Sequence, residues 1–181
     1  MTANSGRYDG PSPVSVDARW TVERLTPPSR LMGANGLRTG ADGRIYVAQV
    51  AGSQISAIDP DSGRIETISG RDGPVIAPDD LVFDEDGNIY ITEITEGRLT
   101  VLSPDGNHHV LKGDMPVANP VTYHQGRLIA GECRPDGRVM EIDRSSGEAR
   151  MILEGVPMPN AFSIGPDGLL YMPIMGTNEI W

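Results

Sequence analysis

The chain has 181 residues, of which 22 are Gly and 15 are Pro, a share above average usage that favours many turns and short strands. Hydrophobic residues make up 38%, enough for a core, and the single cysteine excludes an intrachain disulfide and a Cys-based zinc cluster. The formal net charge of −10, without any basic cluster, excludes a nucleic-acid partner.

The N-terminal residues carry neither an apolar core nor a basic leader, so no signal peptide is predicted. No apolar run approaches the ~20 residues of a membrane span. We therefore expect a soluble, cytoplasmic protein without a membrane partner, its oligomeric state left open. Residues 1–13 are expected to form a flexible N-terminus and residues 14–181 a partial domain. Within this domain, Arg19–Leu25 is a candidate outer strand that would close a ring made by later repeats.

Four segments then line up as internal repeats. Their turn glycines are separated by steps of 44, 39 and 42 residues, and periods of 20–50 residues indicate a repeat architecture. The repeats start near residues 34, 78, 118 and 159. The aligned segments are Ala34–Val50, Pro78–Ile94, Ala118–Cys133 and Pro159–Met175.

The second repeat shows the plan of each unit. Leu81–Asp84 is a short apolar run, and the following Asp86-Gly87 pair supplies the positive φ of a tight hairpin turn. Further strands are predicted over Ile89–Thr92, Leu99–Leu102 and His109–Leu111. Four antiparallel strands in every ~40–45 residues are typical of a propeller blade.

The length of the chain limits how many blades it contains. Propellers typically have four to eight blades, whereas this period predicts about three and a half. We therefore predict an all-β propeller fold, the fourth blade of which stops at Trp181 near the start of its third strand. We interpret the chain as the N-terminal portion of a longer protein or as a truncated gene product.

One polar residue stands at the start of the first strand in every repeat. These residues are Asn35, Asp79, Asn119 and Asn160. If the first strands surround a central axis, their amide and carboxylate oxygens converge and suit Ca²⁺, or else Mg²⁺. The alternative is structural, because Asn and Asp favour turns and strand starts in any case. Zinc is less favoured, because His124 is isolated and the His108-His109 pair lies on an outer strand.

A second set of polar residues ends the second strands, which return to the same face. It consists of Gln49, Glu93 and Glu132. These side chains are interpreted either as substrate contacts or orienters of the site, or as solvated charges at strand ends. Cys133 has no histidine at a spacing that indicates a nucleophile, so a buried thiol is expected.

Two motifs carry a family resemblance. They are Pro159-Asn160-Ala-Phe followed by Gly-Pro-Asp-Gly-Leu-Leu-Tyr, and Pro78-Asp79-Asp80-Leu-Val-Phe-Asp-Glu-Asp-Gly-Asn-Ile-Tyr. At these residues the sequence resembles the senescence marker protein/gluconolactonase family of six-bladed β-propellers, over roughly Gly33 to Trp181. The resemblance implies hydrolysis of lactones or related esters, with one divalent cation on the axis held by a Glu, two Asn and an Asp. NHL-repeat and lyase-type propellers share part of the pattern.

When the metal ligands of the family are matched to the repeats of this sequence, only some of them find an equivalent residue. Asn119 and Asn160 match the two Asn ligands, and Asn35 stands where the family has its Glu. The family's Asp belongs to the blade after Asn160, beyond Trp181. Asp79 occupies a blade where the family often has no ligand, so it is either an added ligand or a substitute base.

The resemblance thus implies a metal-dependent hydrolase acting on a small lactone or ester, with Ca²⁺ the expected cofactor and Mg²⁺ or Zn²⁺ the alternatives. The cation would polarise the carbonyl, and Asp79 is the candidate carboxylate that activates water. Two other functions stay open: a non-catalytic propeller that binds a protein or peptide, and a lyase-type propeller. The lyase would need an axial histidine, a place that His108, His109 and His124 do not take in the repeat alignment.

Overall fold

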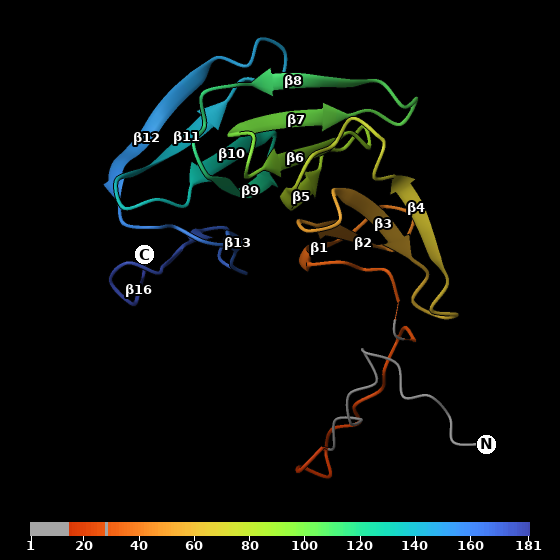
Figure 1. Cartoon of the computed structure of the whole chain (residues 1–181). Helices are drawn as coiled ribbons and strands as arrows, with labels where there is room; N and C mark the ends of the chain where they lie inside the picture. The colour runs from red at the N-terminus through yellow and green to blue at the C-terminus, as the bar shows by residue number, and fades with distance from the viewer. Residues whose placement is uncertain (1–14, 28) are drawn as a thin grey trace, which may run out of the picture.

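The first three repeats each fold as a four-stranded antiparallel sheet whose strands pair in chain order (Figure 1). The computed structural model describes residues 15–27 and 29–181, so the predicted flexible segment 1–13 lies outside the described residues. The first sheet contains β1 (Ala34–Thr39), β2 (Ile45–Gln49), β3 (Gln54–Ile58) and β4 (Ile65–Ser69). The second contains β5 (Pro78–Phe83), β6 (Ile89–Glu93), β7 (Arg98–Leu102) and β8 (His108–Lys112). The third contains β9 (Ala118–His124), β10 (Arg127–Glu132), β11 (Gly137–Ile142) and β12 (Ala149–Val156).

The fourth repeat forms two short hairpins. They are built from β13 (Ser163–Ile164) with β14 (Leu170–Tyr171), and from β15 (Pro173–Ile174) with β16 (Glu179–Ile180). β14 and β15 occupy the place of the second strand of a blade, and β16 that of the third. Pro173 interrupts this second strand because proline has no backbone N–H to give to a sheet.

Tight turns join the first two strands of each sheet. Gly87, between β5 and β6, has a φ of 83°, a conformation that glycine adopts without steric cost. The Asp84 carboxylate closes the same turn, because it accepts the backbone N–H groups of Asp86 at 3.0 Å and Asn88 at 2.9 Å. The predicted Asp-Gly hairpin is thus formed by its own side chain and backbone.

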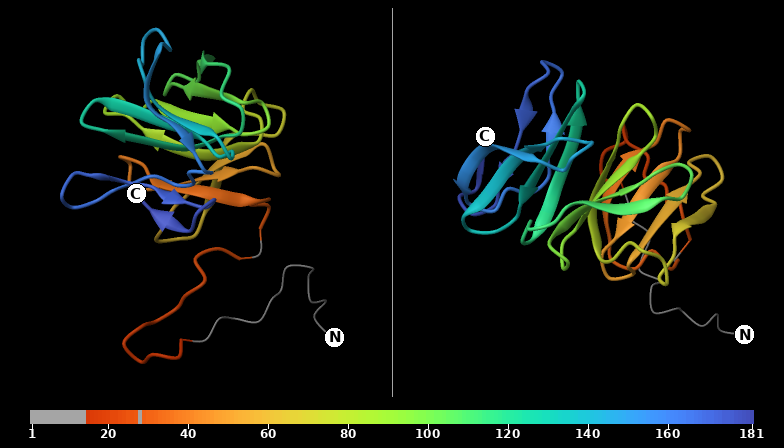
Figure 2. Two further views of the ribbon diagram at one scale, coloured as in Figure 1. Left: turned by 90° about the vertical axis from the view of Figure 1, so that its left-hand side faces the viewer. Right: turned by 90° about the horizontal axis from the view of Figure 1, so that it is seen from above.

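The first strands of successive sheets lie side by side, with β5 between β1 and β9. The sheets follow one another along an arc in chain order (Figures 1 and 2). Aliphatic clusters fill the space between them, one of which joins the first sheet to the second through Ile55, Leu81 and Ile91. Similar clusters join the second sheet to the third and the third to the fourth repeat. The predicted all-β propeller architecture is confirmed.

Much of the segment that precedes β1 extends away from the sheets (Figure 1), and it returns to the first sheet at Met32, whose backbone N–H binds Gln49 of β2. Arg19–Leu25, the candidate closing strand, is assigned to no strand in the described part of the chain. Trp20 is 71% exposed and Val22 is 51% exposed. Within the described residues, no helix has the length and apolarity needed to cross a bilayer.

Candidate functional site

The four predicted ligand residues occupy the same structural position in their repeats. The residue before each of them pairs with the end of the following second strand, as Pro78 does with Glu93 and Ala118 with Glu132. In the first three sheets the pairing register shifts immediately afterwards, so Asn35, Asp79 and Asn119 lie in a β-bulge. Bulges re-aim side chains and occur often beside active sites.

A repeated backbone turn places these residues. Two positions before each of them stands a residue in the left-handed conformation: Gly33 (φ 67°), Ala77 (φ 44°), Val117 (φ 58°) and Met158 (φ 59°). The carbonyl of each left-handed residue accepts a backbone N–H from the end of the second strand, respectively from Val50, Ile94, Cys133 and Met175. Because β1, β5 and β9 lie side by side, Asn35, Asp79 and Asn119 come to the same end of neighbouring strands. Asn160 follows the equivalent bridge, between Pro159 and Ile174, in the fourth repeat.

Asp79 has the most perturbed environment of the four. Its side chain is largely buried, with 6% of the residue exposed. Burial and the neighbouring Asp80 charge raise the pKa of Asp79 to about 6, although a hydrogen bond with the Asn35 side chain opposes the shift. A carboxylate that titrates near neutrality is a group with the proton affinity of a general base.

The three asparagines differ in exposure. Asn119 is buried, Asn160 is partly buried and Asn35 is exposed. The Asn160 side-chain amide donates to the Met175 sulfur at 3.2 Å, an interaction that engages its nitrogen rather than its oxygen. The carbonyl oxygen of this side chain therefore stays available as an acceptor or ligand.

Glu93 and Glu132 form ion pairs with arginines of their own repeats. Glu93 is fully buried and binds Arg98 at 2.6 Å and the Thr100 hydroxyl at 2.7 Å. Glu132, also fully buried, binds Arg138 and, at 3.0 Å, Arg134. Burial raises the pKa of Glu132, but its hydrogen bonds with both arginines outweigh burial and leave the pKa below its usual value.

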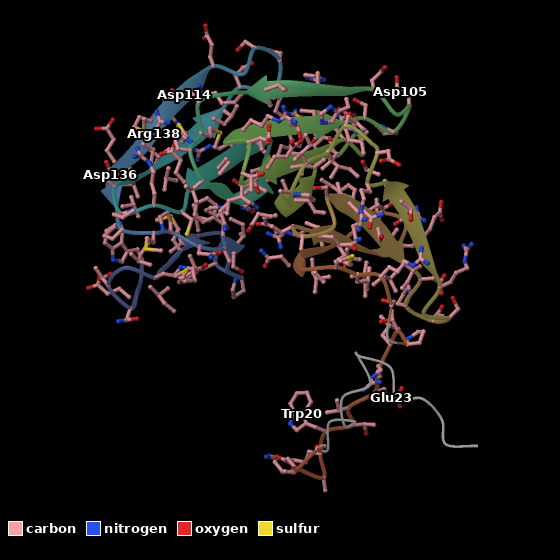
Figure 3. The ribbon with its side chains drawn as sticks, in the orientation of Figure 1. Trp20, Glu23, Asp105, Asp114, Asp136 and Arg138 are labelled. Carbon is pink, nitrogen blue, oxygen red and sulfur yellow. The ribbon has the colours of Figure 1, made fainter. Side chains whose placement is uncertain are left out.

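The third residue of this set is buried as well. The Gln49 side chain donates to the Ser56 hydroxyl at 2.8 Å and accepts the Met32 backbone N–H at 2.9 Å. None of the three is a solvated strand-end group. Arg138, the partner of Glu132, also donates to the Asp114 backbone carbonyl at 2.7 Å. Both residues are labelled in Figure 3.

Three further residues lie at the site. Asp80 follows Asp79 directly and binds Arg38 of β1 at 2.9 Å, a contact between sheets that sequence spacing alone does not indicate. Cys133 lies close enough to Asp79 for their charges to interact. Burial, and then the Asp79 charge, raise the pKa of the Cys133 thiol. The position of Cys133 directly after Glu132 in the repeat alignment is the signal that could have placed it here.

The donor set of this site consists mainly of amide and carboxylate oxygens. Across residues 15–27 and 29–181, no three His, Cys, Asp or Glu side chains are grouped to hold a metal ion. His108 lies beside Glu93 at 3.5 Å on the outer strand β8, and His124 stands at the far end of β9.

A groove of about 440 Å³ opens on the same face as the candidate site. It is lined by residues 94–97 and 114–117. Its lining includes Ile94 and Val117, whose backbone hydrogen bonds lie beside the bulges of Asp79 and Asn119. A larger groove of about 710 Å³ lies at the opposite ends of the strands, among turn residues such as Asp84 and Arg144.

Solved structures share this fold. A streptogramin B lyase matches with a TM-score of 0.69 and 21% identity, over 87% of this chain and 53% of that one. A nidogen/laminin complex matches with a TM-score of 0.71 and 19% identity, over 81% of this chain and 59% of that one. A suspected gluconolactonase matches with a TM-score of 0.62 and 16% identity, over 77% of this chain and 56% of that one.

At these identities the likeness shows the β-propeller fold alone. The chain spans only 53% to 59% of the length of these three structures. The sequence matches no protein-family model, and no curated protein sequence matches it. The neighbours include enzymes of different chemistry, so the function of this chain has to be argued from its own side chains.

Proposed function

We propose that this chain contributes to a cation-dependent hydrolase of lactones or related esters. The observation that supports the proposal is the repeated left-handed turn that precedes Asn35, Asp79, Asn119 and Asn160, the first three of which lie in bulges of neighbouring strands. Asp79 is the one carboxylate in the set, and Arg38 pairs with Asp80 rather than with Asp79. The negative charge of Asp79 is therefore left available at this position.

The residues present fit a hard divalent cation. Oxygen atoms of one carboxylate and three amides are ligands that Ca²⁺ accepts, whereas Mg²⁺ demands a stricter geometry and Zn²⁺ prefers nitrogen and sulfur. A bound cation would supply Lewis-acid polarisation of a substrate carbonyl. Because ligand charge sets affinity and only one ligand is charged, we expect a weak site, with a Kd on the order of 10⁻⁴–10⁻³ M for Ca²⁺.

Asp79 is the candidate base for the hydrolytic step. In the cation-free chain its pKa is raised to about 6, so it is mostly deprotonated at neutral pH. The Asn35 side chain favours the charged form of this carboxylate, against the larger effects of burial and Asp80 on its pKa. The groove lined by residues 94–97 and 114–117 opens on the same face, and it is the candidate place for the body of a small lactone.

A cation titration tests the proposal. We expect Ca²⁺ in the millimolar range to raise the Tm of the wild-type chain, because a ligand that binds only the folded state stabilises it. Asn119→Ala should remove this shift. Asn107→Ala, which changes an exposed turn asparagine that binds Asp105, should retain it. Lactone hydrolysis by the full-length protein should then fall with Asp79→Ala.

Two outcomes would overturn the proposal. If Ca²⁺, Mg²⁺ and Zn²⁺ all leave the wild-type Tm unchanged, the four residues are structural, and a non-catalytic binding propeller becomes the better explanation. If the cations bind but Asp79→Ala hydrolyses lactones at the wild-type rate, Asp79 is not the base. A lyase-type function would require a histidine at the candidate site, and His108, His109 and His124 stand on β8 or at the far end of β9.

A further inference from the structure

We infer that Asp80 and Thr92, with Arg38, are positioning residues that hold Asp79 and Asn119 at the spacing a shared cation requires. This inference rests on the proposed function, and it assigns a role to three residues outside the predicted ligand set. All three lie at the junction of the first three sheets, where β5 passes between β1 and β9.

Asp80 joins all three sheets through one carboxylate. Its Oδ2 accepts the Arg38 guanidinium of β1 at 2.9 Å and the Val121 backbone N–H of β9 at 3.3 Å. Its Oδ1 accepts the Leu81 backbone N–H of β5 at 2.9 Å. The side chain is nearly inaccessible to water, so these hydrogen bonds act in a low-dielectric environment and fix the carboxylate firmly.

Thr92 joins the backbones that carry two of the ligand residues. Its hydroxyl lies 2.6 Å from the Asn119 carbonyl oxygen, to which it donates, and it accepts the Asp80 backbone N–H at 3.1 Å. Thr92 is fully buried on β6. A single hydroxyl thus links the peptide unit after Asp79 to the peptide unit of Asn119, and it leaves little freedom in the separation of the two.

Arg38 completes the junction from the first sheet. Besides its ion pair with Asp80, its guanidinium donates to the Val121 carbonyl at 3.4 Å. The sheets approach so closely here that a Cβ atom on Gly36 would lie 2.7 Å from the Asp79 carbonyl oxygen. Any larger residue at position 36 would push β1 away from β5, so the close packing of these two strands requires glycine there.

The repeats themselves show that this junction is not a general requirement of the fold. The positions equivalent to Asp80 hold Gly36, Pro120 and Ala161. The positions equivalent to Thr92 hold Ala48, Gly131 and Pro173. Only the second repeat, which also carries the single carboxylate of the ligand set, has this buried polar pair. A blade can thus be built without the pair, and its place beside Asp79 and Asn119 favours a role in positioning them.

The test uses neutral substitutions, because removing the Asp80 charge would weaken cation binding whatever its geometry. Thr92→Val keeps the shape of the side chain and removes the hydroxyl, and Thr92→Ser restores it. The matched control is Thr100→Val, which removes another fully buried hydroxyl of the same sheet, bound at 2.7 Å to Glu93. Ca²⁺ affinity by calorimetry, the lifetime of Eu³⁺ luminescence and urea unfolding are measured for each variant.

We expect Thr92→Val to weaken Ca²⁺ binding about 10- to 100-fold, the usual effect of removing a group that orients a ligand. The Eu³⁺ lifetime should shorten as water replaces a displaced protein ligand. Thr92→Ser should recover most of the affinity. Thr100→Val should lose stability but bind Ca²⁺ as the wild type does.

A second variant examines the hold on Asp80 without removing its charge. Arg38→Gln takes away the guanidinium that binds the Asp80 carboxylate at 2.9 Å, and it should weaken Ca²⁺ binding even though the loss of a nearby positive charge would by itself strengthen it. Equal affinities of the wild type, Thr92→Val and Thr100→Val would overturn the positioning role and leave the proposed function standing. A wild type that binds neither Ca²⁺ nor Eu³⁺ would overturn the proposed function, and this inference with it.

Discussion

Asp79→Asn is expected to stabilise the chain at neutral pH in the absence of divalent cations. The pKa of Asp79 is about 6 in the folded state against an ordinary value of 3.8. Between these values the folded state binds more protons than the unfolded state, so stability falls as pH rises and the whole cost is present above pH 6. Asparagine removes the charge and keeps the shape of the side chain, so the variant avoids this cost.

The size of the gain follows from the same shift. Each pKa unit corresponds to about 1.4 kcal/mol, so a shift of this size sets a ceiling of about 3 kcal/mol. Screening by water at a partly open site reduces this to roughly 1–2 kcal/mol at pH 7.5. At pH 4 the gain should fall to roughly 0.5 kcal/mol, because the wild-type carboxyl is then mostly protonated in the folded state.

Urea unfolding followed by far-UV circular dichroism, at pH 4 and pH 7.5 with a chelator present, measures both values. Asp72→Asn, at an exposed loop position, is the control and should shift stability little at either pH. An Asp79→Asn gain of the same size at both pH values, or no gain at pH 7.5, would refute the argument. Adding Ca²⁺ at pH 7.5 should reverse the order, because only the wild type retains the charged ligand.

Three other substitutions test the geometry around the site, each by urea unfolding. Gly36→Ala should cost about 1–3 kcal/mol through the clash with the Asp79 and Asp80 backbone, whereas Gly113→Ala, which meets nothing within 4 Å, should be nearly neutral. Val117→Gly should gain about 0.5–1 kcal/mol, because a β-branched residue is strained at a φ of 58°. Glu132→Ala should cost about 3 kcal/mol, because two arginines lose a buried partner.

The repeat period predicted the architecture well because hairpin chemistry is local. The Asp-Gly turn before β6 and the alternating strands are specified within each repeat, and three four-stranded sheets follow from them. The same alignment placed Asn35, Asp79 and Asn119 at equivalent positions of their repeats, and in the structure each of them lies in a bulge. The positions of the ligand candidates could therefore be found from spacing.

The environments of the site residues could not be found in this way. Glu93 and Glu132 stand at the strand ends where they were predicted, yet each is neutralised by arginines of its own sheet. The ion pair between Arg38 and Asp80 joins residues 42 positions apart in the sequence. The equivalent positions of the other repeats hold neither an arginine nor an aspartate that could have indicated the pair. Such partners depend on how one sheet packs against the next, and a pattern within one repeat contains no information about that packing.

The aliphatic clusters that join each sheet to the next in sequence have a consequence for local unfolding. In an array of this kind, the free energy of unfolding is approximately the sum of the intrinsic stability of each repeat and the interface energy between neighbouring repeats. A terminal repeat has only one such interface, so local unfolding starts at the ends. The second and third sheets have packed neighbours on both sides and should exchange their amide protons most slowly. A ligand bound by residues of all four repeats would couple the ends of the array to these middle sheets, and the ligand should protect the amides at the ends most.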